Sequence, residues 1–462
     1  MKVWNMTDYV ADARDATAGI QRAIDECYLA GGGEVRVSAG DWYIGDVRLR
    51  SRVTLHLEKD AHLIGSRDLS DYDHILADTL EPIGDEHKTD VIWCPYAVRS
   101  EYERHHMSHR NKCLSTWNRA MLRAVDAHDI AIVCEEGSYI DGRDCYDERG
   151  EEEFRGPHAI SAHRCEHLTF TGLDIRNSGH FGFVLFDCVD VRIERPRVSG
   201  GHDGVHMTTC TDVTICDGVF KTGDDCIAGV DNQNLLVLRC YLNSACSAFR
   251  LGGTDVLVED TAIVGPGEYM HRMTLSKTDQ INGTVTPEDA HKHRRNMLNA
   301  YMYYADYSRP IRKPGGNIRL RNCTVENATR FLEYDFSGNN PWQQNKPLLD
   351  ISFENVKATG LKLPMMIYGD KDAPITVSFV DCDLAYAEPR VGDAPSGCVA
   401  RVCHYRKLSF KNVTVRGLGA AAAVKAWNDG SDIVAGTLIS DAEGERVVLT
   451  DGDFFKPDPE RD

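Results

Sequence analysis

The sequence predicts an all-β fold, a single-stranded parallel β-helix with one capping helix near its N-terminus. The main observation is a short phrase, an Asp, Asn or His followed by alternating apolar residues, which recurs between residues 167 and 255 in steps of 21 to 23 residues. A period of about 22 residues without a helix fits one coil of a parallel β-helix, in which each coil adds a strand to each stacked sheet. Nine copies of the phrase begin at His167, Asp190, Asp212, Asn234 and Asp255 and, less clearly, at Asp129, Asn317, Asp350 and Lys407.

Two other folds also have recurring strands, the β-sandwich and the β-propeller. The spacing decides against them, because whole phrases recur at nearly equal steps along the chain. The parallel β-helix is therefore favoured.

The capping helix is predicted from Thr17 to Ala30, within a cap over residues 10–33. Its apolar residues Ile20, Ala23, Ile24 and Cys27 have the spacing of a helix with one buried face. A run of three glycines from Gly31 ends it. A cap is needed because an open solenoid end exposes apolar side chains and unpaired strand edges.

The rest of the chain is predicted to form one parallel β-helix domain over residues 1–455. Two long polar stretches, 74–120 and 261–316, interrupt the period and are predicted to be loop insertions near the active-site cleft. The tail 456–462 is predicted to be disordered.

Charge and composition exclude several classes of partner. With 52 Lys and Arg against 71 Asp and Glu, the formal net charge is −19, which disfavours nucleic acid and anionic membranes. No apolar run follows Lys2, so a cytoplasmic location is expected. The 16 cysteines are too dilute for a disulfide framework and are predicted to be buried free thiols. No zinc-binding spacing is present, and no metal or cofactor is predicted. The oligomeric state is not predicted.

Three carboxylates are predicted to meet on neighbouring coils. Asp203 and Asp225 are 22 residues apart, and Asp224 comes one place earlier. Stacked strands lie about 4.8 Å apart, so the three side chains should share one small patch. Like charges this close raise one another's pKa, and at least one carboxyl is expected to keep its proton near neutral pH. A protonated acid beside ionised bases suits glycoside cleavage. A simple turn and a calcium site are the alternatives.

The segments around these carboxylates resemble a known enzyme family. Gly201-His202-Asp203-Gly204 and Gly223-Asp224-Asp225-Cys226-Ile227-Ala228 are similar to paired motifs of the polygalacturonases, glycoside hydrolase family 28. The resemblance implies a right-handed parallel β-helix and hydrolysis with inversion. It also implies that Asp224 is the general acid and that Asp203 and Asp225 activate water. Inversion needs acid and base roughly 6.5–9.5 Å apart, which a one-coil step with a sideways offset is expected to give.

The sequence departs from that family at two places. The family's Gly-His-Gly corresponds to Ala245-Cys246-Ser247, so its histidine is replaced, and His180, His202 and Cys246 are the candidates to take its place. The family's Arg-Ile-Lys, which holds the uronate carboxylate, corresponds to Glu333-Tyr334-Asp335. Two anions would repel a uronate, so a neutral sugar is expected, with Arg250 left to bind an anionic group or a hydroxyl. The predicted substrate-binding residues are His180, His202, Arg250, Glu333 and Asp335.

The resulting prediction is an intracellular, inverting, polygalacturonase-like glycoside hydrolase. It is expected to remove terminal residues from an imported oligosaccharide, because long insertions would close one end of the cleft. One alternative is a true galacturonan or pectic oligosaccharide hydrolase. Others are a β-helix lyase, epimerase or transglycosylase, and a non-catalytic glycan-binding protein.

Overall fold

The chain divides into two compact units, residues 1–224 with 269–293 and residues 225–268 with 294–462. Among the described residues, one α-helix accompanies many β-strands, and no helix is long and apolar enough to cross a membrane. Most of the stretch 74–120, much of 261–316 and the tail 456–462 lie outside the described residues. The computed structural model describes residues 2–72, 119–147, 155–271, 295–305, 314–336, 343, 346–387, 398–418, 421–427, 437–440, 443–444 and 446–452.

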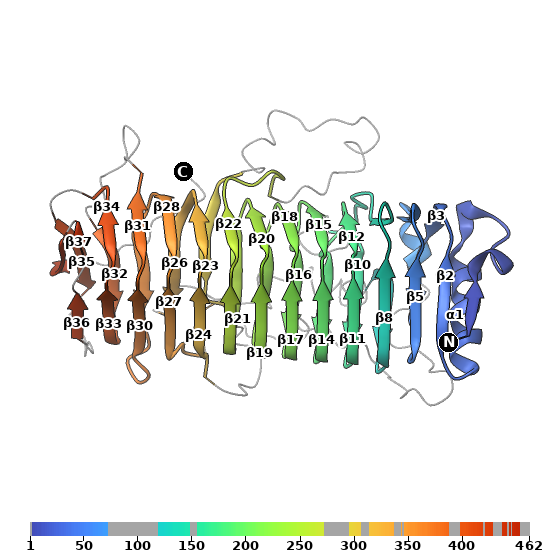
Figure 1. Ribbon diagram of the computed structural model, residues 1–462, viewed down its shortest axis with the longest axis horizontal. Coiled ribbons are helices and arrows are strands. Elements are labelled where there is room, and N and C mark those ends of the chain that lie inside the picture. The colour runs from blue at the N-terminus through green and yellow to red at the C-terminus, as the bar shows by residue number, and fades with distance from the viewer. Residues whose placement is uncertain are drawn as a thin grey trace. The chain divides into compact units, whose positions relative to one another are not determined.

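The first unit is a stack of coils that form three sets of parallel strands, and it confirms the predicted parallel β-helix (Figure 1). The first set pairs in the order β1 (Val3–Asn5), β2 (Gly33–Val37), β5 (Val53–Leu57), β8 (His128–Cys134), β11 (Glu166–Thr171), β14 (Val189–Glu194) and β17 (Thr211–Cys216), and its last four strands carry the phrase. The second set is β3 (Gly40–Ile44), β6 (Ala61–Gly65), β9 (Tyr139–Asp141), β12 (Asp174–Arg176), β15 (Arg197–Gly200) and β18 (Val219–Thr222). The third set is β4 (Val47–Arg48), β7 (Ala120–Val125), β10 (His158–His163), β13 (Phe183–Phe186) and β16 (Val205–Thr208).

The repeated phrase has a backbone explanation. His167, Asp190 and Asp212 have φ values of 56°, 55° and 57°, in the left-handed region. Asp and Asn tolerate this region because their short polar side chains bond locally, and His is enriched there too. The alternating apolar residues that follow point into the coil, and in β11, β14 and β17 they lie in register. Each buried apolar side chain of this size contributes about 1.5–3 kcal/mol.

The N-terminal cap agrees with the prediction and adds one strand. Helix α1 covers Thr17–Leu29, and Ile20, Ala23, Ile24 and Cys27 are buried beneath it. The short strand β1 precedes the helix and pairs with β2, which the sequence pattern did not predict because β1 has only three residues. Gly32 has a φ of 102°, and a Cβ there would lie 2.3 Å from the Arg52 carbonyl oxygen. The glycine run is therefore needed for the turn from the helix into β2.

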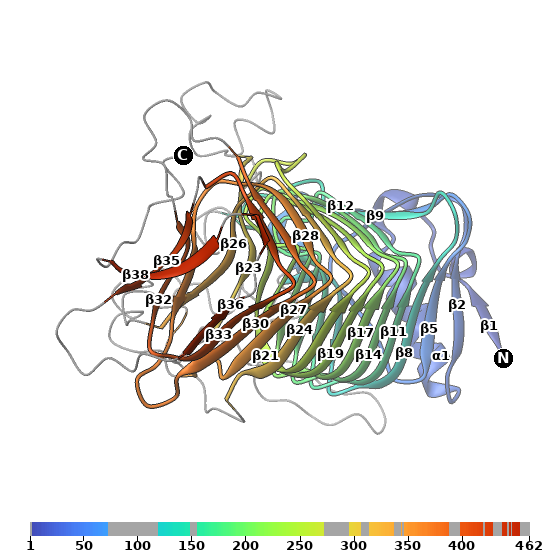
Figure 2. The same cartoon turned by 60° about the vertical axis from the view of Figure 1, so that its left-hand side comes forward.

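The second unit repeats the same plan (Figure 2). The phrase set is the later parts of β19 (Ile227–Leu238) and β21 (Ser247–Glu259), then β24 (Gly316–Arg321), β27 (Asp350–Glu354), β30 (Ile375–Val380), β33 (Tyr405–Lys411) and β36 (Thr437–Ser440). The second set is β20 (Tyr241–Ser244), β22 (Ala262–Val264), β25 (Thr324–Glu326), β28 (Lys357–Leu361), β31 (Asp383–Tyr386), β34 (Thr414–Arg416) and β37 (Glu443–Gly444). The third set is the early parts of β19 and β21, then β23 (Met297–Met302), β26 (Ala328–Asp335), β29 (Met365–Tyr368), β32 (Cys398–Cys403), β35 (Ala421–Trp427) and β38 (Arg446–Gly452).

All nine copies of the phrase lie in these strands. The stretch 261–316 is not a single insertion, because β22 and β23 fall inside it and pair with the neighbouring coils. The insertion predicted there was therefore drawn too long.

A column of phenylalanines stabilises the core of the second unit. The Phe353 and Phe379 rings stack with centroids 4.8 Å apart, and the Phe379 and Phe410 rings stack at 5.0 Å. Phe331 meets Phe353 edge-on at 4.8 Å. The substitution Phe353→Ala, at the centre of the column, would remove contacts on both sides.

We expect Phe353→Ala to lower the free energy of unfolding by about 3–5 kcal/mol, the usual cost of emptying a buried aromatic site. Urea unfolding of the full chain measures it, with the exposed Leu349→Ala as control, for which a loss of about 0.5 kcal/mol or less is expected. Equal losses in the two variants would contradict the importance of this column.

Candidate active site

Two turns at the ends of neighbouring strands hold the predicted acids. Strands β15 and β18 pair with Gly200 opposite Thr222. Within the first unit, Gly201 and His202 therefore correspond to Gly223 and Asp224 on the next coil. Asp203 corresponds to Asp225, and Asp224 comes one place earlier, as the period predicted.

Asp203 is fixed by a histidine three residues later. His206 Nδ1 lies 3.0 Å from Asp203 Oδ2, and both side chains are buried. The His206 ring also stacks on Phe181, with centroids 4.8 Å apart and planes 2° from parallel. The stacked His206 ring thus holds one oxygen of Asp203 in place.

Asp224 lies between two basic side chains of the first unit, Arg155 and His271. Arg155 Nη2 donates to Asp224 Oδ2 at 2.8 Å, and His271 Nε2 lies 3.3 Å from Asp224 Oδ1. Burial raises the pKa of the Asp224 carboxyl, but His271 and Arg155 outweigh it and hold that pKa well below its usual range. At least one of the three carboxyls was expected to keep its proton near neutral pH, and the surroundings of Asp224 do not favour that proton on Asp224.

The distance between the first two acids is also shorter than predicted. An oxygen of Asp203 and an oxygen of Asp224 lie within 4.8 Å of each other. The roughly 6.5–9.5 Å typical of inverting enzymes is not reached. The structure thus brings Asp203 and Asp224 together, but their spacing does not itself predict inversion.

A column of imidazoles continues from the Asp224 position along the first unit. His158, His180 and His202 precede Asp224 in steps of 22 residues. The ring centroids of His158 and His180 are 4.3 Å apart, and those of His180 and His202 are 6.1 Å apart. Burial, with His158 and Arg155, holds the pKa of His180 well below its usual range. Burial and Arg155 do the same for the pKa of His202. Both imidazoles are therefore neutral at neutral pH.

A small cavity of about 10 Å³ lies beside His180, His202 and Asp203. That volume is about what one water molecule needs, so the cavity is too small for a sugar.

Asp225 belongs to the second unit. The Ser247 backbone N–H donates to Asp225 Oδ1 at 3.0 Å, and Arg250 Nη1 lies 3.8 Å from Oδ2. The Arg250 guanidinium also lies over the Tyr304 ring, 4.5 Å from its centroid. Cys246, one of the candidates to replace the family's histidine, is also in this unit and is partly exposed. A carboxylate that accepts a backbone N–H and faces a guanidinium is stabilised in its ionised form.

Glu333 and Asp335 do not present open negative charge. Glu333 is bonded to Arg330, and both side chains are buried. Asp335 is fully buried in β26. The register places Glu333 opposite Met302 and Met302 opposite Arg250, so Glu333 lies two strands from Arg250. Arg330 therefore offsets the charge of Glu333, on which the expected repulsion of a uronate partly rested.

Four residues at the site were missed from the sequence. Two of them could have been found from their spacing in the sequence. His158 continues the 22-residue series, and His206 follows Asp203 by three places. Arg155 precedes β10, and His271 follows β22 by several residues. These two come from irregular segments, where the period gives no position.

Asp144, in the turn after β9, makes stability depend on pH. Burial raises the pKa of its carboxyl to about 7, and Asp141 adds to the increase. The folded chain then keeps a proton that the unfolded chain loses near pH 4, so stability falls as pH rises from about 4 to 7. We expect Asp144→Asn to remove this loss and to be more stable than wild type at pH 8 by about 1 kcal/mol or more, with little difference at pH 4. Melting curves at both pH values measure it, and equal differences at the two would contradict it.

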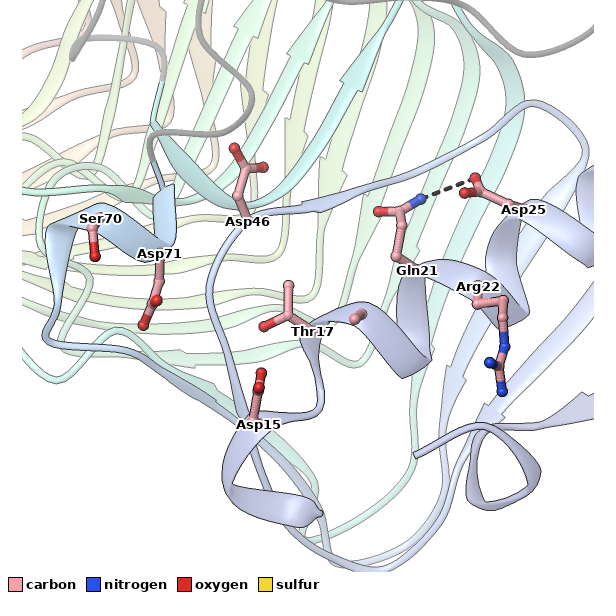
Figure 3. Close-up of a pocket in the computed structure, with 9 residues that line it drawn as sticks. Asp15, Thr17, Gln21, Arg22, Asp25, Asp46, Ser70 and Asp71 are labelled. Carbon is pink, nitrogen blue, oxygen red and sulfur yellow. Dashed lines mark hydrogen bonds between the residues drawn. The ribbon is translucent and has the colours of Figure 1, made fainter. Parts of the chain in front are cut away.

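A larger pocket lies at the cap, away from these acids. Its volume is about 520 Å³, and Figure 3 shows its lining of α1 side chains and nearby carboxylates. Asp46 is bonded to Arg123, and Asp25 bonds Arg50 at 2.8 Å and Gln21 at 3.0 Å. These interactions fasten α1 to the first coils, so the pocket reads as part of the cap.

Comparisons with known proteins point to one family. Residues 104–247 match the family model described as glycosyl hydrolases family 28. A polygalacturonase of Malus domestica is 31% identical over 82 residues, 17% of this chain and 18% of that protein. A polygalacturonase of Penicillium janthinellum is 28% identical over 242 residues, 47% of this chain and 64% of that protein. The chain thus spans less than two thirds of the length of these curated relatives.

Among solved structures, an exopolygalacturonase of Thermotoga maritima matches with a TM-score of 0.60 and 15% identity, over 90% of this chain and 92% of that one. At that identity the likeness concerns the fold. The matched family segment contains Asp203, Asp224 and Asp225. The chain is therefore polygalacturonase-like, similar to glycosyl hydrolases family 28 in sequence over residues 104–247 and built as the same right-handed parallel β-helix.

Proposed function

We propose that this chain is a glycoside hydrolase that cleaves an oligosaccharide, with Asp224 as general acid and Asp203 and Asp225 as the groups that activate water. The observation that carries the proposal is the placement of Asp203 and Asp224 in matched turns of neighbouring coils, with oxygens within 4.8 Å. Such a pair can act on one glycosidic bond, because both oxygens reach the atoms around a single anomeric carbon.

The proposed chemistry needs one proton donor and one proton acceptor. The acid gives its proton to the glycosidic oxygen, which leaves with the electron pair of the broken carbon–oxygen bond. A water molecule adds to the anomeric carbon and loses its proton to a carboxylate. The family resemblance implies inversion of the anomeric configuration. Because the oxygens of Asp203 and Asp224 are closer than is typical of inverting enzymes, the configuration of the product has to be measured.

The proposal includes two classes of sugar substrate. A neutral residue was expected from Glu333 and Asp335, but the Glu333–Arg330 pair weakens that reason. Galacturonate oligomers are therefore equal candidates, and Arg250, with its side chain about a quarter exposed, is the cation we propose to meet a carboxylate or hydroxyl. Removal of terminal residues is proposed because a long stretch before β7 and another between β22 and β23 interrupt the repeat.

We also propose that the protein works inside the cell. The support is chemical: 14 cysteines in the described part of the chain are free thiols, most of them buried. Free thiols in this number suit a reducing compartment.

The test incubates purified protein with galacturonate oligomers and a panel of neutral oligosaccharides, and follows released sugars by chromatography over time. Hydrolysis of one class is expected, with single residues appearing first if cleavage is terminal. Products with a 4,5-double bond would show lyase chemistry instead. Binding without any released sugar would favour the glycan-binding alternative.

A further inference from the structure

One residue of the candidate active site comes from outside the repeating turns. His271 follows β22 by seven residues, and its side chain is 4% exposed. Its Nε2 lies 3.3 Å from Asp224 Oδ1. His271 thus contacts one of the predicted catalytic acids, Asp224.

The local packing is built to admit this histidine. A Cβ at Gly223 would lie 1.9 Å from the carbonyl oxygen of Met270, the residue before His271. Any side chain at 223 would therefore push the backbone of Met270 away. The glycine next to Asp224 and the backbone next to His271 fit each other directly, so the His271–Asp224 contact is a feature of the fold and not a chance approach of a side chain.

The same contact raises a question about the acid. Each oxygen of Asp224 faces a basic side chain, Arg155 on one side and His271 on the other, and both lower the pKa of the carboxyl. Such a carboxyl gives up its proton readily to solvent. A general acid must hold a proton at working pH, so Asp224 alone is badly suited to the step proposed for it.

We propose that His271 is the proton-holding partner of Asp224, so that the proton given to the leaving oxygen is stored on the His271–Asp224 pair. This inference rests on the proposed glycoside hydrolysis. An imidazolium beside a carboxylate and an imidazole beside a carboxylic acid contain the same single proton. The pair keeps that proton to a higher pH than Asp224 could beside Arg155 alone, because the carboxylate stabilises the imidazolium.

The proton balance closes over one turnover. Asp224 gives its proton to the glycosidic oxygen as the carbon–oxygen bond breaks. The His271 imidazole then takes up a proton from solvent, which restores the single proton of the pair. The attacking water loses one proton to a carboxylate, which returns it to solvent. No oxidant, reductant or other reactant is needed.

The groups that act on His271 in the first unit can be named from the described residues. Asp224 favours the imidazolium, and Arg155, bound to the same carboxylate, opposes it. His202 interacts with His271 as well, and its own pKa is held well below its usual range, so it adds no charge near neutral pH. His271 acts through Asp224 and is therefore a positioning residue. It and Asp224 together hold one proton.

The first test measures kcat/KM against pH for wild type and His271→Gln, on a substrate that wild type cleaves. Glutamine can still donate to Asp224 but cannot carry the proton. We expect a loss of about 10- to 100-fold at pH 7 and a loss about tenfold smaller at pH 5, because Asp224 must now bind its proton unaided. The alkaline limb of the profile should move to lower pH. His128→Gln, at an exposed histidine, is the matched control and should leave the profile unchanged.

The second test needs no substrate. NMR titration of the His271 imidazole in wild type and Asp224→Asn should show its pKa fall by about one pH unit or more in the variant, since the carboxylate is gone. An unchanged His271 pKa, or a uniform loss of activity at every pH in His271→Gln, would overturn the proposal. If wild type itself cleaves no sugar, the hydrolase proposal fails, and the NMR result still decides whether the pair shares a proton.

Discussion

Replacing Asp224 by Asn is expected to lower kcat by about 10²- to 10⁴-fold, the contribution usual for a general acid. Asparagine keeps the shape of the side chain but cannot give a proton to the leaving oxygen. Arg155 and His271 both contact this side chain, so the loss should appear in kcat and not only in KM. Initial rates over a range of substrate concentrations on the best cleaved oligosaccharide measure it.

A stability control belongs with this variant, because Asp224 also serves Arg155. The ion pair is buried, and removing one partner of such a pair commonly costs about 3–5 kcal/mol. The double variant Arg155→Met with Asp224→Asn should recover part of that stability without recovering activity. If a folded Asp224→Asn variant turns over at the wild-type rate, Asp224 is not the acid.

Asp225→Asn is expected to lower kcat by a similar factor, about 10²- to 10⁴-fold, for the opposite reason. Asp225 is 1% exposed, accepts the Ser247 backbone N–H and faces Arg250, which together hold its carboxyl group in place. An amide accepts the Ser247 bond equally well but cannot take a proton from water. The variant should therefore fold normally and fail in turnover.

The matched control for Asp225→Asn is Asp255→Asn in the same unit. Asp255 is exposed and has a φ of 59°, which asparagine tolerates, so both stability and activity should stay near wild type. Rates of both variants on the same substrate, with melting curves, separate chemistry from folding. Equal activity in the two would remove Asp225 from the mechanism.

The fold could be predicted from the sequence because the phrase reports directly on the backbone. An Asp, Asn or His such as Asp190 or Asn234 marks a left-handed residue once per coil, and the alternating apolar residues after it mark a strand with one face inward. The same period placed Asp203 and Asp224 in matched turns. Strand β1 was missed because three residues are too few to show a period.

The surroundings of the acids could be predicted less well. Arg155 and His271 reach Asp224 from segments that do not follow the period, so no spacing argument could place them. The pKa of Asp224 was misjudged for the same reason, since the effect of Arg155 and His271 outweighs the effect of burial. Glu333 was read as an open anion because its partner Arg330, three residues earlier on the same strand, was not considered.

The most direct test of the central claim follows oligosaccharide cleavage by proton NMR, with wild type and Asp225→Asn side by side on galacturonate and neutral oligomers. The anomeric signals report both whether a glycosidic bond is hydrolysed and which anomer is released first. The account predicts that wild type hydrolyses one of the two classes of oligomer. The new reducing end should have the configuration opposite to that of the cleaved bond. Asp225→Asn should leave the substrate intact. Hydrolysis at equal rates by both proteins, or no hydrolysis of any oligomer by wild type, would contradict it.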